Sequence, residues 1–150
     1  MARHQPSLGS RALSFLARRE HSRVELARKL AKHATERDDI EALLDALVTK
    51  GWLSEARYAE QVIRTKARRF GPLKVAHYLR AKGVDGEAIS AGLRAAGHDG
   101  VSSIETVWKS RFHAPPADDR EKARQARFLQ ARGFPFDEIL RFMKARKAKP

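Results

Sequence analysis

Apolar residues recur three or four positions apart through most of the chain, the spacing that places a single stripe on one face of a helix. The same stripe returns at a fixed interval, because Leu30, Leu79 and Leu129 lie 49 and 50 residues apart. Each leucine is followed by apolar residues at matching distances: Ile40 and Leu44, Ile89 and Leu93, Ile139 and Met143. A fixed period of this length indicates an internal repeat.

Each of the three units predicts three helices. The second and third helices are indicated by ELARKLAKH and DIEALLDALVTKG in the first unit, by LKVAHYLRAKG and GEAISAGLRAAG in the second, and by ARQARFLQARG and FDEILRFMKAR in the third. A further helix is predicted before each pair, over residues 10–19, 55–70 and about 103–112. No segment shows the alternation of period two that is typical of a strand.

The residues at the expected helix boundaries agree with this pattern. Ser22 stands three residues before Glu25, and Ser102 three before Glu105, as in a capping box. Glycines, which end helices readily, stand where helices should end: Gly51, Gly83, Gly97 and Gly133. Two prolines, Pro72 and Pro135, suit the first turn of a helix. Two acidic pairs, Asp38–Asp39 and Asp118–Asp119, stand near predicted helix starts, where the helix dipole favours negative charge.

The repeat predicts the architecture. A unit of under 50 residues buries too little apolar surface to be stable alone, whereas stacked units cover one another's apolar edges. We therefore expect an all-α fold, an elongated curved array of three tandem three-helix repeats; the alternative is a compact helical bundle. The expected divisions are an extended or disordered segment over 1–9, repeats over 10–53, 54–100 and 101–150, and a basic tail at the end of the last repeat. Repeat arrays with sealed ends usually act as monomers, and we expect a monomer.

Composition narrows the class of protein. Hydrophobic residues make up 42% of the 150-residue chain and charged residues 33%, which favours a globular protein over a disordered or membrane protein. No apolar run approaches the roughly 20 residues of a membrane span, and the first ten residues lack the apolar core of a signal peptide. The absence of cysteine excludes disulfides and thiolate metal sites and is compatible with the cytoplasm.

The chain is strongly basic, with 31 Lys and Arg against 18 Asp and Glu and a net charge of +13. Divided after Leu53 and Gly100, its three parts carry +3, +4 and +6, so the excess is not confined to a tail. Such a charge favours a polyanionic partner, either nucleic acid or an acidic protein surface.

Three groups of cations are candidate binding residues, since arginine can hold phosphate or carboxylate through paired hydrogen bonds. The first group follows the core-facing Tyr58, Val62 and Ile63 in a segment without acids; its members are Arg64, Lys66, Arg68, Arg69, Lys74, Arg80 and Lys82. The second, in which Glu20 and Glu25 are interleaved and favour ion pairing, comprises Arg18, Arg19, Arg23 and Arg28. The third comprises Arg141, Lys144, Arg146, Lys147 and Lys149. The alternative for any one cation is a solvated helix end that offsets the helix dipole.

Four segments together resemble the RecX family: SFLARREHSRVELARKL, GWLSEARYAE, RRFGPLKVAHYLRAKGV and KARQARFLQARGFPFDEILRFM. The resemblance covers about Arg11 to Lys144. It implies a fold of tandem three-helix repeats, in agreement with the period above. The resemblance also implies the partner, which charge and periodicity do not identify: the RecA recombinase filament on DNA. Members of the family generally inhibit the strand exchange, ATP hydrolysis and coprotease activity of this filament.

Two other classes of function stay open. A stand-alone basic DNA-binding module is possible because three-helix units can resemble helix-turn-helix domains, although no helix rich in Asn, Gln and Arg offers base recognition. Largely sequence-independent DNA contact is expected as a secondary activity. An enzyme is disfavoured, because the chain has no HExxH, Walker or nucleophile-elbow motif, and we expect no cofactor and no metal. The aromatic residues expected in the core are Trp52, Trp108, Phe128, Phe134, Phe136 and Phe142.

Overall fold

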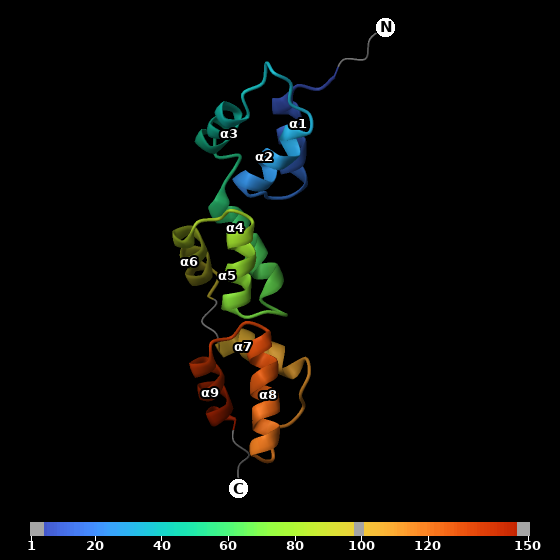
Figure 1. The fold of residues 1–150 in the computed structure, drawn as a ribbon. Coiled ribbons are helices and arrows are strands. Elements are labelled where there is room, and N and C mark those ends of the chain that lie inside the picture. The colour runs from blue at the N-terminus through green and yellow to red at the C-terminus, as the bar shows by residue number, and fades with distance from the viewer. Residues whose placement is uncertain (1–4, 98–100, 147–150) are drawn as a thin grey trace.

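The computed structural model describes residues 5–97 and 101–146, and these residues form nine helices and no strand. The helices follow one another as three groups along an elongated array (Figure 1), which confirms the predicted all-α repeat fold. The first repeat holds α1 (Leu8–Arg18), α2 (Arg23–Ala31) and α3 (Ile40–Thr49). The second holds α4 (Glu55–Lys66), α5 (Pro72–Ala81) and α6 (Gly86–Ala95), and the third α7 (Val101–Lys109), α8 (Asp119–Ala131) and α9 (Phe136–Ala145).

Each repeat buries its own apolar cluster, built from the positions that recur in the sequence. Leu30, Leu79 and Leu129 are fully buried, one in each of the three clusters. The other recurring positions are buried at Leu44, Ile89, Ile139 and Met143 and half-buried at Ile40 and Leu93. Three small cores in a row, instead of one large core, give the molecule its length.

Most helix starts are capped by side chains, as the sequence indicates. The Ser22 hydroxyl accepts a hydrogen bond from the Glu25 amide at 3.1 Å, and Asp39 and Asp118 cap α3 and α8 in the same way. Pro72 is the first residue of α5. Two boundary predictions were wrong: α7 begins at Val101, so Ser102 lies inside it, and Pro135 precedes α9 instead of entering its first turn.

Helix α4 also ends earlier than predicted, at Lys66 instead of residue 70. The amides of Arg69 and Phe70 still donate to the Lys66 carbonyl, so the chain closes in a turn before Gly71 and Pro72. A residue that precedes proline is disfavoured in the helical region, and Gly71 is accordingly extended, with φ −82° and ψ 175°, so no helix runs through from α4 into α5.

Two of the aromatic predictions were wrong as well. Trp108 and Phe134 are buried, and Phe128 and Phe142 pack half-buried against the third core. Trp52 is 47% exposed and Phe136 54% exposed. In both cases a neighbour fills the core position instead, since Leu53 and Phe134 are almost fully buried.

The middle helices α2, α5 and α8 follow one another end to end along the array (Figure 1). Where α8 meets α5, the Gly71 amide donates to the Arg132 carbonyl at 2.8 Å and the Leu73 amide donates to the Gly133 carbonyl at 3.0 Å. Helix ends leave such amides and carbonyls without partners, so each helix here satisfies the other. Gly133 has a φ of 100°, and a Cβ added to it would lie 2.5 Å from the Cβ of Lys74. Only glycine fits this contact.

The junction between the first two repeats uses a related contact but different polar links. Gly83, at the end of α5, lies against Val24 near the start of α2, where an added Cβ would lie 2.4 Å from a Val24 methyl carbon. The polar links are made by side chains: Arg57 Nε donates to Glu20 Oε1 at 2.8 Å, and the Arg23 amide donates to a carboxylate oxygen of Glu55 at 3.4 Å. None of the helices in the described part of the chain combines the length and the hydropathy that a membrane span needs.

Candidate partner-binding surface

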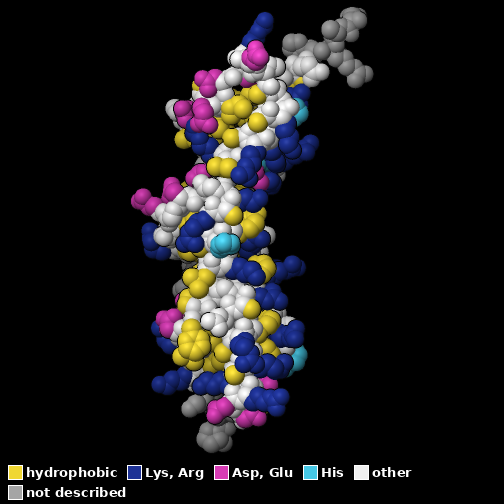
Figure 2. All heavy atoms as spheres, in the orientation of Figure 1, with side chains coloured by type: hydrophobic (Ala, Val, Ile, Leu, Met, Phe, Trp, Pro, Cys, Tyr) yellow, Lys and Arg dark blue, Asp and Glu magenta, His cyan; other side chains and the backbone are white. Residues whose placement is uncertain are grey.

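Lys and Arg side chains occur on the surface of all three repeats, and Asp and Glu form smaller groups among them, with a dense one over the first repeat (Figure 2). The distribution follows the sequence, in which each third of the chain carries excess positive charge. A cation can serve a partner only where the fold does not already pair it with an acid. The contacts of each predicted cation therefore decide which of them form a candidate site.

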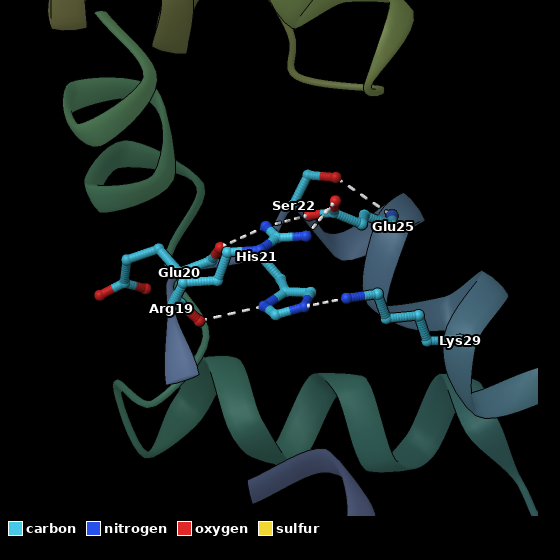
Figure 3. A network of polar contacts seen from close by, with 6 residues as sticks. All are labelled: Arg19, Glu20, His21, Ser22, Glu25 and Lys29. Atoms are coloured by element: carbon cyan, nitrogen blue, oxygen red, sulfur yellow. Dashed lines mark hydrogen bonds and ion pairs between the residues drawn. The ribbon is translucent and has the colours of Figure 1, made fainter. Parts of the chain in front are cut away.

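A buried histidine organises the polar groups at the start of α2 (Figure 3). His21 is 1% exposed; its Nδ1 lies 3.0 Å from the Arg19 carbonyl oxygen and its Nε2 lies 2.7 Å from Lys29 Nζ. Because the carbonyl can only accept and the ammonium can only donate, the ring is neutral with its proton on Nδ1. Burial lowers the pKa of His21 and also that of Lys29.

Arg19 is committed to an ion pair in the same network (Figure 3). Its two terminal nitrogens donate to the two carboxylate oxygens of Glu25 at 3.0 and 2.8 Å. The hydrogen bond to Glu25 raises the pKa of Arg19. Burial works against ionisation of Glu25, but the hydrogen bond and charge of Arg19 outweigh it, and the pKa of Glu25 is lowered.

A groove of about 350 Å³ separates the first repeat from the second. Its lining residues come from both repeats: Arg19, Glu25, Tyr58, Gln61, Val62, Thr65, Lys66 and Tyr78. The fold thus brings Arg19 and Lys66, which belong to two separate predicted groups, to one groove. Burial raises the pKa of the Tyr58 hydroxyl further above neutral.

Cations and aromatic rings alternate along the second and third repeats in an arrangement that we call the cation–aromatic ladder. Its members are Lys82, Tyr78, Lys66, Phe70, Lys74, Arg132, Phe128 and Arg111. Each cation lies 4.2 to 5.9 Å from the centroid of a neighbouring ring, within the range of cation–π attraction. The ladder crosses the junction between repeats at Arg132, which lies over Phe70 of one repeat and Phe128 of the next.

The structure divides the first predicted group of cations. Lys66, Lys74 and Lys82 belong to the ladder. Arg64 lies elsewhere, in a groove of about 270 Å³ beside the end of α6. The remaining members are exposed and form no ion pair with any described residue: Arg68, Arg69 and Arg80.

Half of the second group is consumed by internal pairing, and one of these pairs, Arg19 with Glu25, uses an interleaved acid. Besides the pair formed by Arg19, Arg23 lies 2.7 Å from carboxylate oxygens of both Glu41 and Asp45. Arg18 and Arg28 are exposed and make no ion pair within the described ranges.

Two members of the third group form ion pairs within their own repeat. Arg141 pairs with Asp137 at 3.5 Å, and Arg146 pairs with Glu105 and lies 4.9 Å from the Trp108 ring centroid. Lys144 is exposed, and Lys147 and Lys149 lie outside the described residues. Across the described residues, no three His, Cys, Asp or Glu side chains form a group that could hold a metal ion.

Sequence reasoning missed Arg132 and Arg111, the two ladder arginines of the third repeat. A signal for Arg132 was present, because the basic residue before the helix-ending glycine recurs one period apart, as Lys82–Gly83 and Arg132–Gly133. Its position over two rings depends on the contact between repeats, which the local sequence does not encode.

Comparisons with known proteins agree across the chain. Family models described as the first, second and third three-helix domains of RecX match residues 10–47, 54–93 and 99–143. A protein named Regulatory protein RecX from Leptothrix cholodnii is 47% identical over 137 residues, covering 91% of this chain and 87% of its own length. A protein of the same name from Herminiimonas arsenicoxydans is 42% identical and covers 98% of this chain and 97% of its own length. The crystal structure of RecX from Lactobacillus salivarius shares the fold with a TM-score of 0.73 at 21% identity, over 92% of this chain and 93% of its own.

Proposed function

Because the chain belongs to the RecX family, we propose that it is a non-enzymatic regulator that binds RecA recombinase filaments on DNA and inhibits their recombinase, ATPase and coprotease activities. The relatives' name, Regulatory protein RecX, supports a regulatory role. The observation that carries the proposal is the shape of the charged surface. Cations lie along the whole elongated array of three repeats (Figures 1 and 2). A helical filament is an extended and periodic partner, which a long repeat surface can span.

The proposed contact uses the side of the second repeat that bears the ladder. Lys66 and Lys74 are held against rings there, which reduces the conformational freedom that binding must remove. Arg68 and Arg69 stand beside them, exposed and without an acidic partner in the described part of the chain. Bound across neighbouring RecA subunits, a monomer in the cytoplasm would hinder the motions and access that strand exchange needs, with no cofactor.

The test reverses the charge of the two free arginines, in the variant Arg68→Glu/Arg69→Glu. Each lost contact to a charged group is worth roughly 1.5–3 kcal/mol, so the concentration needed to inhibit the RecA ATPase should rise about tenfold or more. The matched control is Arg94→Glu, an exposed arginine in the last turn of α6 in the same repeat. If the double variant inhibits like the unchanged protein, Arg68 and Arg69 make no contact that inhibition requires.

A stand-alone DNA-binding module is the second candidate, favoured by the net charge of +13. The two candidates differ in their preferred partner. Binding should be compared on bare single-stranded DNA, free RecA and RecA assembled on DNA, followed by ATPase measurement. Equal affinity for bare and RecA-coated DNA, with no effect on ATP hydrolysis, would favour the DNA-binding module.

A further inference from the structure

A third groove, of about 680 Å³, lies in the third repeat between α8 and the segment that precedes it. Four arginines line it, at positions 111, 120, 124 and 127, and none of them belongs to a predicted group of cations. We call this the arginine groove.

The acids of the arginine groove are already committed. The Asp118 carboxylate accepts a hydrogen bond from the Glu121 amide at 2.8 Å and caps α8. The two Glu121 oxygens accept from Arg124 at 2.8 and 3.0 Å. Three cations remain exposed without an ion pair among the described residues: Arg111, Arg120 and Arg127. The four arginines of the groove outnumber the two carboxylates of Asp118 and Glu121, so the groove presents a net positive charge.

The position of Arg120 is not explained by helix stability. It is the second residue of α8, where the helix dipole disfavours a positive charge. Arg120 and Arg127 are seven residues apart, which places them about 10 Å apart along the helix axis. That separation is wide enough for the two arginines to contact different phosphates of one strand.

The rings of the groove are not available for base stacking. Phe112 is buried, with the Arg124 guanidinium 5.2 Å from its centroid and the edge-on Phe128 ring at 5.3 Å. Phe128 in turn lies beneath Arg111 and Arg132. Proteins that stack on bases offer free aromatic faces, which these rings do not.

We propose that the arginine groove binds the phosphodiester backbone of a nucleic acid strand without reading its bases. The inference rests on the proposed function for its partner and assigns the DNA contact to the third repeat. The ladder continues the positive surface from Arg111 through Arg132 towards Arg69, whose carbonyl accepts from Arg132 at 3.5 Å. A long track of positive charge suits a uniformly charged polymer. An acidic protein surface fits less well, because the groove offers small and polar side chains and no exposed aromatic anchor.

The experiment neutralises the two exposed cations of α8 in the variant Arg120→Gln/Arg127→Gln, with Arg94→Gln/Arg37→Gln as the matched control. Arg94 and Arg37 are exposed and lie in the other two repeats without ion pairs to described residues. Binding of fluorescent single-stranded oligothymidylate is followed by anisotropy over a range of salt concentrations. Each phosphate contact contributes a slope of about 0.7 in log affinity against log salt. In the double variant, which loses two such contacts, the magnitude of this slope should fall by about 1.4. If the affinities of the variant and the unchanged protein converge near 1 M salt, the variant should bind about 25-fold more weakly at about 0.1 M salt. An abasic strand should bind the unchanged protein as well as the oligothymidylate does.

Binding to free RecA without DNA separates this inference from the proposed function. Unchanged DNA affinity in the double variant overturns the phosphate site, and so does a strong preference for normal over abasic strands. Loss of free-RecA binding with DNA affinity retained assigns the groove to an acidic protein surface and also overturns it. Failure of the unchanged protein to affect RecA filaments at all overturns the proposed function instead, whatever the groove binds.

Discussion

The junction between the second and third repeats depends on a glycine, and replacing it tests how tightly the repeats are joined. In Gly133→Ala, the new methyl group would meet the backbone of α5, 2.5 Å from Lys74 Cβ and 2.7 Å from Lys74 N. These atoms belong to the helix start and cannot rotate away. Accommodating the methyl group therefore requires α8 and α5 to separate, which breaks the hydrogen bonds from Gly71 and Leu73 to the end of α8.

The expected loss of stability combines two contributions. Alanine at a φ of 100° is strained by roughly 1–3 kcal/mol. The two hydrogen bonds between helix ends contribute a net 0.5–1.5 kcal/mol each, roughly 1–3 kcal/mol together. The free energy of unfolding should therefore fall by about 2–6 kcal/mol. Urea denaturation measures the total, and hydrogen exchange of the Gly71 and Leu73 amides reports whether the junction opens.

Gly51→Ala is the matched control for the backbone strain alone. Gly51 also ends a helix with positive φ, at 77°, but an added Cβ meets nothing within 4 Å. It should lose roughly 1–3 kcal/mol and leave exchange at Gly71 and Leu73 unchanged. The reasoning about the junction is refuted if Gly133→Ala destabilises no more than Gly51→Ala and leaves both amides protected.

Two further predictions concern buried polar side chains. Because burial lowers the pKa of His21, the unfolded chain binds its proton first as pH falls below about 6.5, and stability drops by up to about 1.4 kcal/mol per pH unit until the folded pKa is reached. In His21→Gln this drop should vanish when unfolding in urea is measured between pH 5.5 and 7.5. The exposed His77→Gln is the control and should keep the drop. An unaltered pH dependence in His21→Gln would contradict a role of buried His21. Gln125 is buried, and its side-chain oxygen accepts a hydrogen bond from Trp108 Nε1 at 2.8 Å. Gln125→Leu leaves the indole N–H unpaired and should lower the free energy of unfolding by roughly 1–3 kcal/mol. The control Gln130→Leu, on the exposed face of the same helix, should lower it little.

The sequence predicted the fold well because core positions and helix ends are local features. Leu30, Leu79 and Leu129 recur at the repeat period because each must fill the same place in its own small core. Glycines at helix ends are similarly local, since positive φ is required wherever the chain turns back. Such features survive without any knowledge of the contacts between repeats.

The candidate site was predicted less well because pairing between side chains is not local. Arg23 follows Ser22 in the sequence, yet its ion-pair partners Glu41 and Asp45 come from α3, 18 and 22 residues away. Arg132 approaches Arg69 across 63 residues. Trp52 and Phe136 show the same limitation for burial, because residue type favours the core but the backbone decides which neighbour enters it.

The two junctions differ in a way that bears on how the array meets a partner. The third repeat is joined to the second by backbone hydrogen bonds between helix ends, with Gly133 packed directly on the chain of α5. The first repeat is joined through side chains such as the half-exposed pair of Arg57 and Glu20, and such pairs contribute roughly 0–1 kcal/mol and weaken with salt. The polar links between the first and second repeats are therefore the weaker ones, although Gly83 also packs against Val24 there. We expect the second and third repeats, which carry the ladder and the arginine groove, to keep their cations at a fixed spacing along whatever partner they bind.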